Sequence, residues 1–321
     1  MIPDSAPAQP AAKARVEWVD SARCLAMFFI MWLHVGQAPG WMGIPVGGGI
    51  CLFFVLAGYF MPREPERAAK RALFLGLAWL LWSGITLGLF ALTQPGVPID
   101  WARAFGYGKA AYNTPLWFLR NLALYQLGIA ALAALHLLPR ANWLLLAVLA
   151  SLTYVREPAQ HEGLRFDWMM AVMLGYCLRS VSLQTIEQWL CRHVWLVLGA
   201  ILFVLLQREY YPLLARLQGL DYYRCSLPVV QLCYALLMCM AAMGLARFAP
   251  QLNRLLATAG GGMMFTYAAH SLLYALIYRY DLPRWCGFAY SAAGIALLTW
   301  LGNLLSARAP RVMGLLTAKC R

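Results

Sequence analysis

Charged side chains are scarce in this sequence. Asp, Glu, Lys and Arg together make up only 12% of its 321 residues, against roughly 25% in an ordinary soluble domain. Hydrophobic residues make up 62%, and a soluble domain of this size has too little interior to bury so much apolar surface. The composition therefore excludes a soluble enzyme and a disordered chain, and it indicates an integral membrane protein.

Acidic residues are especially few, with 13 Asp and Glu against 26 Lys and Arg, which gives a formal net charge of +13. The sequence contains no run of basic residues, and its Lys and Arg stand singly or in pairs near the ends of apolar segments. Membrane proteins place such an excess in their cytoplasmic loops. The charge is thus explained by membrane topology, and no nucleic-acid partner is expected.

Metal-binding and redox patterns are also missing. None of the nine cysteines forms a Cys-x-x-Cys pair, which is the usual pattern of a zinc or redox site. Five of the cysteines lie inside apolar runs, where cysteine behaves as a small buried hydrophobe. The histidines inside apolar segments have no Cys, Asp or Glu at ligand spacing, so we expect no bound metal.

Long apolar segments dominate what is present. A helix needs about 20 apolar residues to span a membrane, and the chain divides into ten such segments, of which the fifth and sixth are short. Their ranges are 19–36, 44–61, 71–93, 115–138, 141–155, 167–181, 192–207, 225–248, 260–279 and 285–306. With the N-terminus inside, most Lys and Arg fall on the side that holds both termini. We predict an all-α bundle of about ten transmembrane helices with both termini cytoplasmic.

The ends of the chain differ in composition from this apolar body. Residues 1–15 are rich in Ala and Pro and are expected to form a flexible cytoplasmic tail. Residues 16–306 are expected to form one membrane domain, and residues 307–321 a basic cytoplasmic tail. Gly84 and Gly88 in the third segment form a Gly-x-x-x-Gly pattern, and Gly260, Gly261 and Gly262 stand together at the start of the ninth. Both groups are expected to permit close helix approach or a hinge.

Four ionisable residues lie where membrane depth makes them costly, and such residues usually mark function. They are Arg23, His34, Arg120 and His270. His34 follows Arg23 by eleven residues, or three helical turns plus about 20°, so the two share a face about 16 Å apart along the axis. Asp20 precedes Arg23 by three residues, where the two can pair. Either Arg23 snorkels to headgroups while His34 bonds a neighbouring helix, or both line a functional site.

Four short motifs, in order along the chain, resemble those of acyltransferase family 3. These bacterial membrane enzymes O-acylate cell-surface glycans and related small molecules. The resemblance covers about residues 16–306, and in the second motif Ala57 stands where the family usually has Ser. The matching elements are Arg23 with His34 after ten residues, FFVLAGYF at 53–60, TPLWFL at 114–119, and Tyr267-Ala268-Ala269-His270.

The resemblance implies an O-acyltransferase, and an O-acetyltransferase in particular, with multiple passes through the bacterial inner membrane. Its donor would be acetyl-CoA or another acyl-CoA in the cytoplasm, and its acceptor a hydroxyl of a cell-surface or lipid-linked glycan. No cofactor would be permanently bound, and membrane lipids would be the remaining partners. Because CoA carries several phosphates, it should favour the inner face, where the cations gather.

The expected catalytic residues are His34, Arg23 and His270. His34 would act as general base for the acceptor hydroxyl, or would form a transient acyl-imidazole. His270 lies some 15 Å above the inner surface by helical rise, a depth similar to that of His34. It would orient or assist His34 or line the acceptor path, and a role in hydrogen-bonded packing is left open.

The expected substrate-binding residues are Arg67, Lys70, Arg71, Arg120 and Asp20. The family often shows Arg-x-x-Arg before the third span, and the nearest match here is Arg67-x-x-Lys70, in which Lys supplies charge without a bidentate fork. These loop cations grip an anionic donor, or they simply follow the positive-inside rule. Arg120 steadies a carbonyl or an anionic acceptor, or pairs with Asp100 or Asp167. Asp20 is expected to hold Arg23 rather than to react.

Two alternatives to an active enzyme remain. A transporter or lipid-linked glycan flippase would use Arg23, His34 and Arg120 to line a substrate path. Such proteins often show two inverted halves with matched broken helices, and this sequence shows no such symmetry. A catalytically inactive membrane scaffold is the other alternative, against which the retained Arg23 and His34 argue.

Overall fold

The structure is a computed structural model, and it describes residues 16–34, 43–101, 105, 113–155, 165–203, 222–277 and 286–318. The expected tail at residues 1–15 lies outside the described residues. Within them the chain is helical and contains no strand. The elements are α1 (Glu17–His34), α2 (Gly43–Tyr59), α3 (Pro65–Thr93), η3 (Thr114–Leu116), α5 (Trp117–Ala134), α6 (Leu138–Val155), α7 (Phe166–Leu178), α8 (Leu183–Arg192), α10 (Tyr222–Phe248), α11 (Pro250–Gly260), α12 (Met263–Ile277), α13 (Cys286–Arg308) and α14 (Pro310–Leu316), with a further apolar helix at Val194–Phe203.

Each of the ten apolar segments coincides with one of these helices. By length and composition, α3, the part of α10 at Val229–Phe248, and α13 can each cross a membrane alone. The helices α7 and α8 pass the same test together, with a bend of 100° between them. The all-helical architecture and these apolar helices support a membrane protein, whereas ten crossings and cytoplasmic termini stay predictions.

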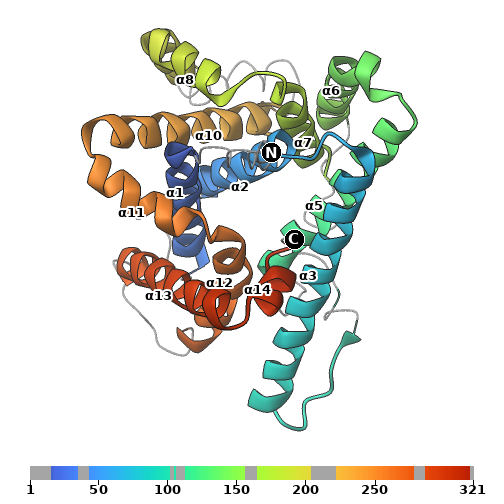
Figure 1. Ribbon diagram of the computed structural model, residues 1–321, viewed down its shortest axis with the longest axis vertical. Coiled ribbons are helices and arrows are strands. Elements are labelled where there is room, and N and C mark those ends of the chain that lie inside the picture. Colours follow the sequence, from blue (N-terminus) through green and yellow to red (C-terminus); the bar gives the residue numbers. More distant parts are fainter. Residues whose placement is uncertain are drawn as a thin grey trace, which may run out of the picture.

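The central element is α1, which packs against α2, α10, α11, α12 and α13 (Figure 1). Small and flexible side chains such as Ala22, Ala26 and Met27 are fully buried in it, so several helices approach it closely. Around this centre α2 packs on α7, while α3 packs along α5 at one edge of the molecule. The helix that carries Arg23 and His34 is therefore surrounded by other helices rather than by lipid.

The expected close approach occurs at one of the two glycine groups. A Cβ at Gly84 or Gly88 would meet nothing within 4 Å, so no close packing occurs there, because this exposed face of α3 points away from the bundle. At Gly260 of α11 the expectation is confirmed, because a Cβ there would overlap the carbonyl oxygen of Asp20 on α1. In addition, a Cβ on Gly58 of α2 would overlap the carbonyl oxygen of Val172 on α7. Gly175 of α7 stands in the same relation to the backbone of α2. These two glycines let α2 and α7 touch backbone to backbone.

Three short helices outside the apolar segments complete the fold. They are α8, α11 and α14, of which α8 is capped by Ser182 Oγ, which accepts from the Thr185 N–H at 3.0 Å. The helices α11 and α14 each begin with Pro, whose fixed φ suits the first helical turn. Within the stretch 307–318, α14 packs on α3, where the Trp82 indole donates to the Leu316 carbonyl at 3.1 Å.

Candidate active site

His34 and His270 lie side by side although 235 residues separate them in the sequence. The contact between α1 and α12 brings their ring centroids to 5.0 Å, with an angle of 50° between the ring planes. His270 is completely buried and His34 is half-buried. This proximity agrees with the similar depth that helical rise predicts for the two residues.

One hydrogen bond determines which nitrogen of His270 carries the proton. Its Nδ1 lies 2.5 Å from the carbonyl oxygen of Tyr267. Because a carbonyl oxygen only accepts, Nδ1 must be the donor, and in a neutral imidazole Nε2 then keeps its lone pair. That Nε2 is buried and has no hydrogen-bond partner among the described residues. The Nε2 atom of His270 can therefore accept a hydrogen bond or a proton from a ligand that reaches it.

The turn of α12 that carries His270 is fixed on both sides. The Tyr267 hydroxyl donates to the Pro115 carbonyl of η3 at 3.0 Å. The Tyr290 hydroxyl of α13 donates to the carbonyl of His270 itself at 3.3 Å. Buried hydrogen bonds of this kind restrict the rotation and sliding of a helix. They hold the histidine at one height beside α1.

A buried asparagine adds a second tie between η3, α3 and α12. Ser271 Oγ donates to Asn113 Oδ1 at 2.6 Å, and Asn113 Nδ2 lies 3.2 Å from Thr86 Oγ1 and 3.4 Å from the Ala268 carbonyl. Asn113 is not among the site residues expected from the sequence. Its local signal is a polar residue two positions before the apolar segment that starts at Pro115.

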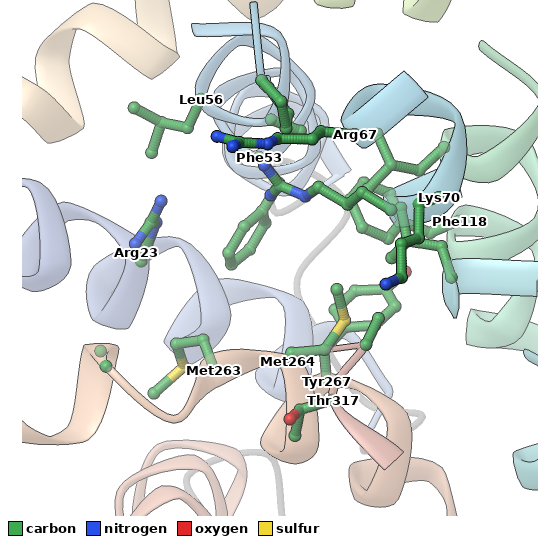
Figure 2. A pocket seen from close by; sticks show the side chains of 18 residues that line it. Arg23, Phe53, Leu56, Arg67, Lys70, Phe118, Met263, Met264, Tyr267 and Thr317 are labelled. Carbon is green, nitrogen blue, oxygen red and sulfur yellow. The ribbon is translucent and has the colours of Figure 1, made fainter. Parts of the chain in front are cut away.

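A cavity of about 760 Å³, called here the cationic cavity, lies beside α1 and α12. Four of its lining residues are cations, and none of its lining residues is a carboxylate. Figure 2 shows Arg23, Arg67 and Lys70 around one open space, with Met264, Tyr267 and Thr317 across from Arg67. The lining residues are Arg23, Phe53, Leu56, Ala57, Pro62, Arg67, Lys70, Arg71, Leu75, Phe118, Leu122, Gly260, Gly261, Met263, Met264, Tyr267, Thr317 and Ala318.

Local structure explains why the cations gather. Arg67, Lys70 and Arg71 follow each other at i, i+3 and i+4 in the first turns of α3, a spacing that puts them on one helix face. Arg71 donates to the Phe60 carbonyl at 2.7 Å, and the exposed Arg67 is 3.7 Å from Glu64. From α1, Arg23 completes the group, with its guanidinium 5.3 Å from the ring centre of Phe60.

Asp20 pairs with Arg23, as the i, i+3 spacing predicts: Arg23 Nη1 donates to Asp20 Oδ1 at 2.9 Å. Arg120 is half-buried in the first turn of α5 and is not a lining residue of the cationic cavity. Arg120 is therefore not one of the cations of this cavity. Asp167, one candidate partner for Arg120, forms an ion pair with Arg165.

Two rows of side chains lead from the cationic cavity to the histidine pair. On α12, Met263 and Tyr267 line the cavity, and His270 continues the same i, i+4, i+7 face. On α1, Arg23 lines the cavity, and His34 shares its face about 16 Å further on. The ring centroids of Tyr267 and His270 are 5.6 Å apart. Tyr267 therefore lines the cationic cavity and also contacts one histidine of the pair.

A second cavity, of about 470 Å³, is also lined by Arg23 and is called here the polar cavity. It shares Arg23 and Gly261 with the cationic cavity. Sequence analysis missed it, although Thr299, Asn303 and Ser306 recur at i, i+4 and i+7 and thus mark a polar face on an apolar helix. The lining residues are Asp20, Arg23, Thr258, Gly261, Gly262, Leu298, Thr299, Gly302, Asn303, Ser306 and Met313.

No three His, Cys, Asp or Glu side chains in the described parts of the chain gather closely enough to hold a metal ion.

In comparisons with known proteins, a family model described as an acyltransferase domain matches residues 16–306, nearly the whole chain. No curated protein sequence and no solved structure matches the chain. The matched stretch contains the histidine pair and all four cations of the cationic cavity.

Proposed function

The chain belongs to acyltransferase family 3, and from that membership we propose that it transfers an acetyl group from cytoplasmic acetyl-CoA to a glycan hydroxyl. The glycan would be a cell-surface or lipid-linked sugar, and the membrane the bacterial inner membrane. The observation that carries the proposal is the His34–His270 pair, which lies one helical turn beyond a cavity lined by four cations.

The cationic cavity suits a donor with an anionic head and a long apolar arm. Its cations come from α1 and the start of α3, where phosphates would be held by charge. Further along α12 the lining is apolar and aromatic, and Tyr267 lies 4.9 Å from Phe118 and 6.1 Å from Phe53 between ring centroids. A slender pantetheine arm would follow this lining and bring its thioester close to the histidine pair.

The chemistry proposed for the pair is general base catalysis. The acceptor hydroxyl would give its proton to an imidazole nitrogen while its oxygen attacks the thioester carbonyl carbon. The carbon–sulfur bond would then break, and the imidazolium would return the proton to the leaving thiolate to give free CoA. The lone pair of His270 Nε2 is suited to receive that proton. His34, whose ring centre is 5.0 Å away, would share the task or accept the acyl group first.

Arg23 would act at the anionic end of the donor rather than at the reacting carbon. By helical rise it is about 16 Å from His34, which is too far for one residue to touch both the proton and the phosphate. Its ion pair with Asp20 aims the guanidinium at the boundary between the two cavities. Neutralising Arg23 should therefore weaken donor binding more than it slows the chemical step.

The test is transfer of label from [¹⁴C]acetyl-CoA to membrane glycan in vesicles that contain the full chain. His34→Ala and His270→Ala are compared with the wild type, and Arg23→Ala is measured over a range of donor concentrations. The matched control is His193→Ala, because His193 lies at the exposed end of α8, where its ring bonds to the Trp189 carbonyl of its own helix.

We expect label with the wild type and His193→Ala, and a large loss with either of the other two histidine variants. Arg23→Ala should recover part of its rate at high donor concentration. No transfer by the wild type from acetyl-CoA would reject the proposed donor. Full activity of both His34→Ala and His270→Ala would reject the histidine pair as the active site.

A further inference from the structure

The polar cavity differs from the cationic cavity in the chemistry of its walls. Thr258, Thr299, Asn303 and Ser306 supply hydroxyl and amide groups that both donate and accept hydrogen bonds. Among the described residues that line it, Arg23 is the single cation, and it already pairs with Asp20 at 2.9 Å. Such walls suit an uncharged ligand with several hydrogen-bonding edges, and they suit a phosphate poorly.

Two further features indicate that a ligand completes this cavity. The hydroxyl oxygen of Thr299 is buried and has no hydrogen-bond partner in the described part of the chain, and an unsatisfied buried polar group is costly unless something else bonds to it. Leu298 and Met313 add buried apolar side chains to the same lining. An apolar lining with a few placed polar groups is typical of small-molecule sites, and it suits a heterocycle that carries hydrogen-bonding groups at its edge.

The position of the cavity identifies which heterocycle fits. It meets the cationic cavity at Arg23 and Gly261, so one long ligand can extend from one cavity into the other. We propose that the polar cavity binds the nucleoside end, base and ribose, of an acyl-CoA donor. The phosphates of the donor then lie among Arg23, Lys70 and Arg71, and its arm runs toward Tyr267. This inference rests on the proposed function, because it assigns the two ends of that donor to the two cavities.

A lipid headgroup is the competing occupant, because the cavity lies beside α13, which is apolar enough to cross a membrane. An anionic lipid would bring its phosphate into walls that hold a single, already paired guanidinium. A nucleoside brings neutral donors and acceptors to three polar side chains on one face of α13. The charge of the walls therefore favours the nucleoside.

The test measures equilibrium binding of labelled CoA and labelled 4′-phosphopantetheine to the purified full chain in nanodiscs of neutral lipid. The second probe lacks the nucleoside, so only the first reports on the polar cavity. The variants are the double substitution Asn303→Ala with Ser306→Ala, whose side chains are both exposed, and the isosteric Thr299→Val. The matched control is Ser180→Ala, because this exposed hydroxyl at the end of α7 bonds to Cys177 of its own helix.

We expect the double variant to bind CoA about tenfold more weakly, equivalent to about 1.4 kcal/mol, and to bind 4′-phosphopantetheine as the wild type does. Thr299→Val should show the same selective loss, and Ser180→Ala should show none. Unchanged CoA affinity in the double variant and in Thr299→Val would overturn the proposal, as would equal losses for both probes. It would also be overturned if phosphatidylglycerol competed with CoA in the wild type but not in the double variant.

Binding also separates this inference from the proposed function. If the wild type binds CoA but transfers no acetyl group, the proposed function fails. The CoA affinities of the variants still show whether the polar cavity binds the nucleoside. If the wild type binds no CoA at all, both are overturned.

Discussion

Replacing His270 by Asn separates the proton-accepting nitrogen from the structural hydrogen bond of the same ring. An Asn side-chain amide reaches the position of Nδ1, so it can still donate to the Tyr267 carbonyl, which lies 2.5 Å from Nδ1 in the native protein. It has nothing at the position of Nε2. His270→Ala removes both groups and leaves a void at a completely buried position.

The two variants should differ in stability much more than in activity. A positioned general base contributes about 10²- to 10⁴-fold to a rate, or about 3–5 kcal/mol in the barrier at 1.36 kcal/mol per tenfold. Acetyl transfer should fall by that factor in both variants. The alanine variant should in addition lose about 1 kcal/mol of stability for the hydrogen bond, and more for the void.

The assay is the initial rate of acetyl transfer per mole of folded protein, with the melting temperature in detergent measured on the same preparations. A transfer rate of His270→Asn within tenfold of the wild type would refute the reasoning that the Nε2 lone pair takes the proton. A melting temperature of His270→Asn as low as that of His270→Ala would refute the assignment of Nδ1 as the structural donor.

Three further predictions follow from the packing and the charges. Gly58→Ala should lower the free energy of unfolding by about 1–3 kcal/mol, because the added methyl overpacks against Val172, whereas Gly84→Ala should raise it by up to about 1 kcal/mol. Equal shifts in melting temperature for the two variants in detergent would contradict the packing described. Lys70→Met should raise the KM for acetyl-CoA about threefold to tenfold at low salt and less at 0.5 M salt, since salt screens an exposed charge; a KM that does not change would remove Lys70 from the donor site. Asn113→Ala should lower the free energy of unfolding by about 1–2 kcal/mol, because three buried hydrogen bonds are lost; an unchanged melting temperature would show that these hydrogen bonds do not stabilise the protein.

Local features of this protein could be predicted from its sequence because they depend on neighbours along one helix. The apolar runs predict the positions of ten helices, since each run overlaps one helix over most of its described residues. The spacing of three residues predicts the ion pair between Asp20 and Arg23. The spacing of eleven residues puts His34 on the same helix face as Arg23. Of these two residues, Arg23 lines the cationic cavity and His34 does not.

Close approach between helices could be predicted only in part, at Gly260, which lies against the backbone of Asp20. The Gly-x-x-x-Gly pattern at Gly84 and Gly88 looks like a packing motif, yet that face of α3 is exposed, whereas the single glycines Gly58 and Gly175 carry the contact between α2 and α7. A small residue permits close packing without specifying it. Which face of a helix meets a neighbour depends on the fit of all the surrounding side chains.

The sequence by itself determined that the chain is helical and apolar, that it resembles acyltransferase family 3, and that a few polar residues interrupt its apolar segments. Only the tertiary structure decided which of these residues meet. It brings His34 to His270 and excludes Arg120 from the cationic cavity, and it opens the polar cavity beside α13. The reason is that periodicity specifies the angle and height of a side chain on its own helix, whereas a site between helices depends on how those helices pack together.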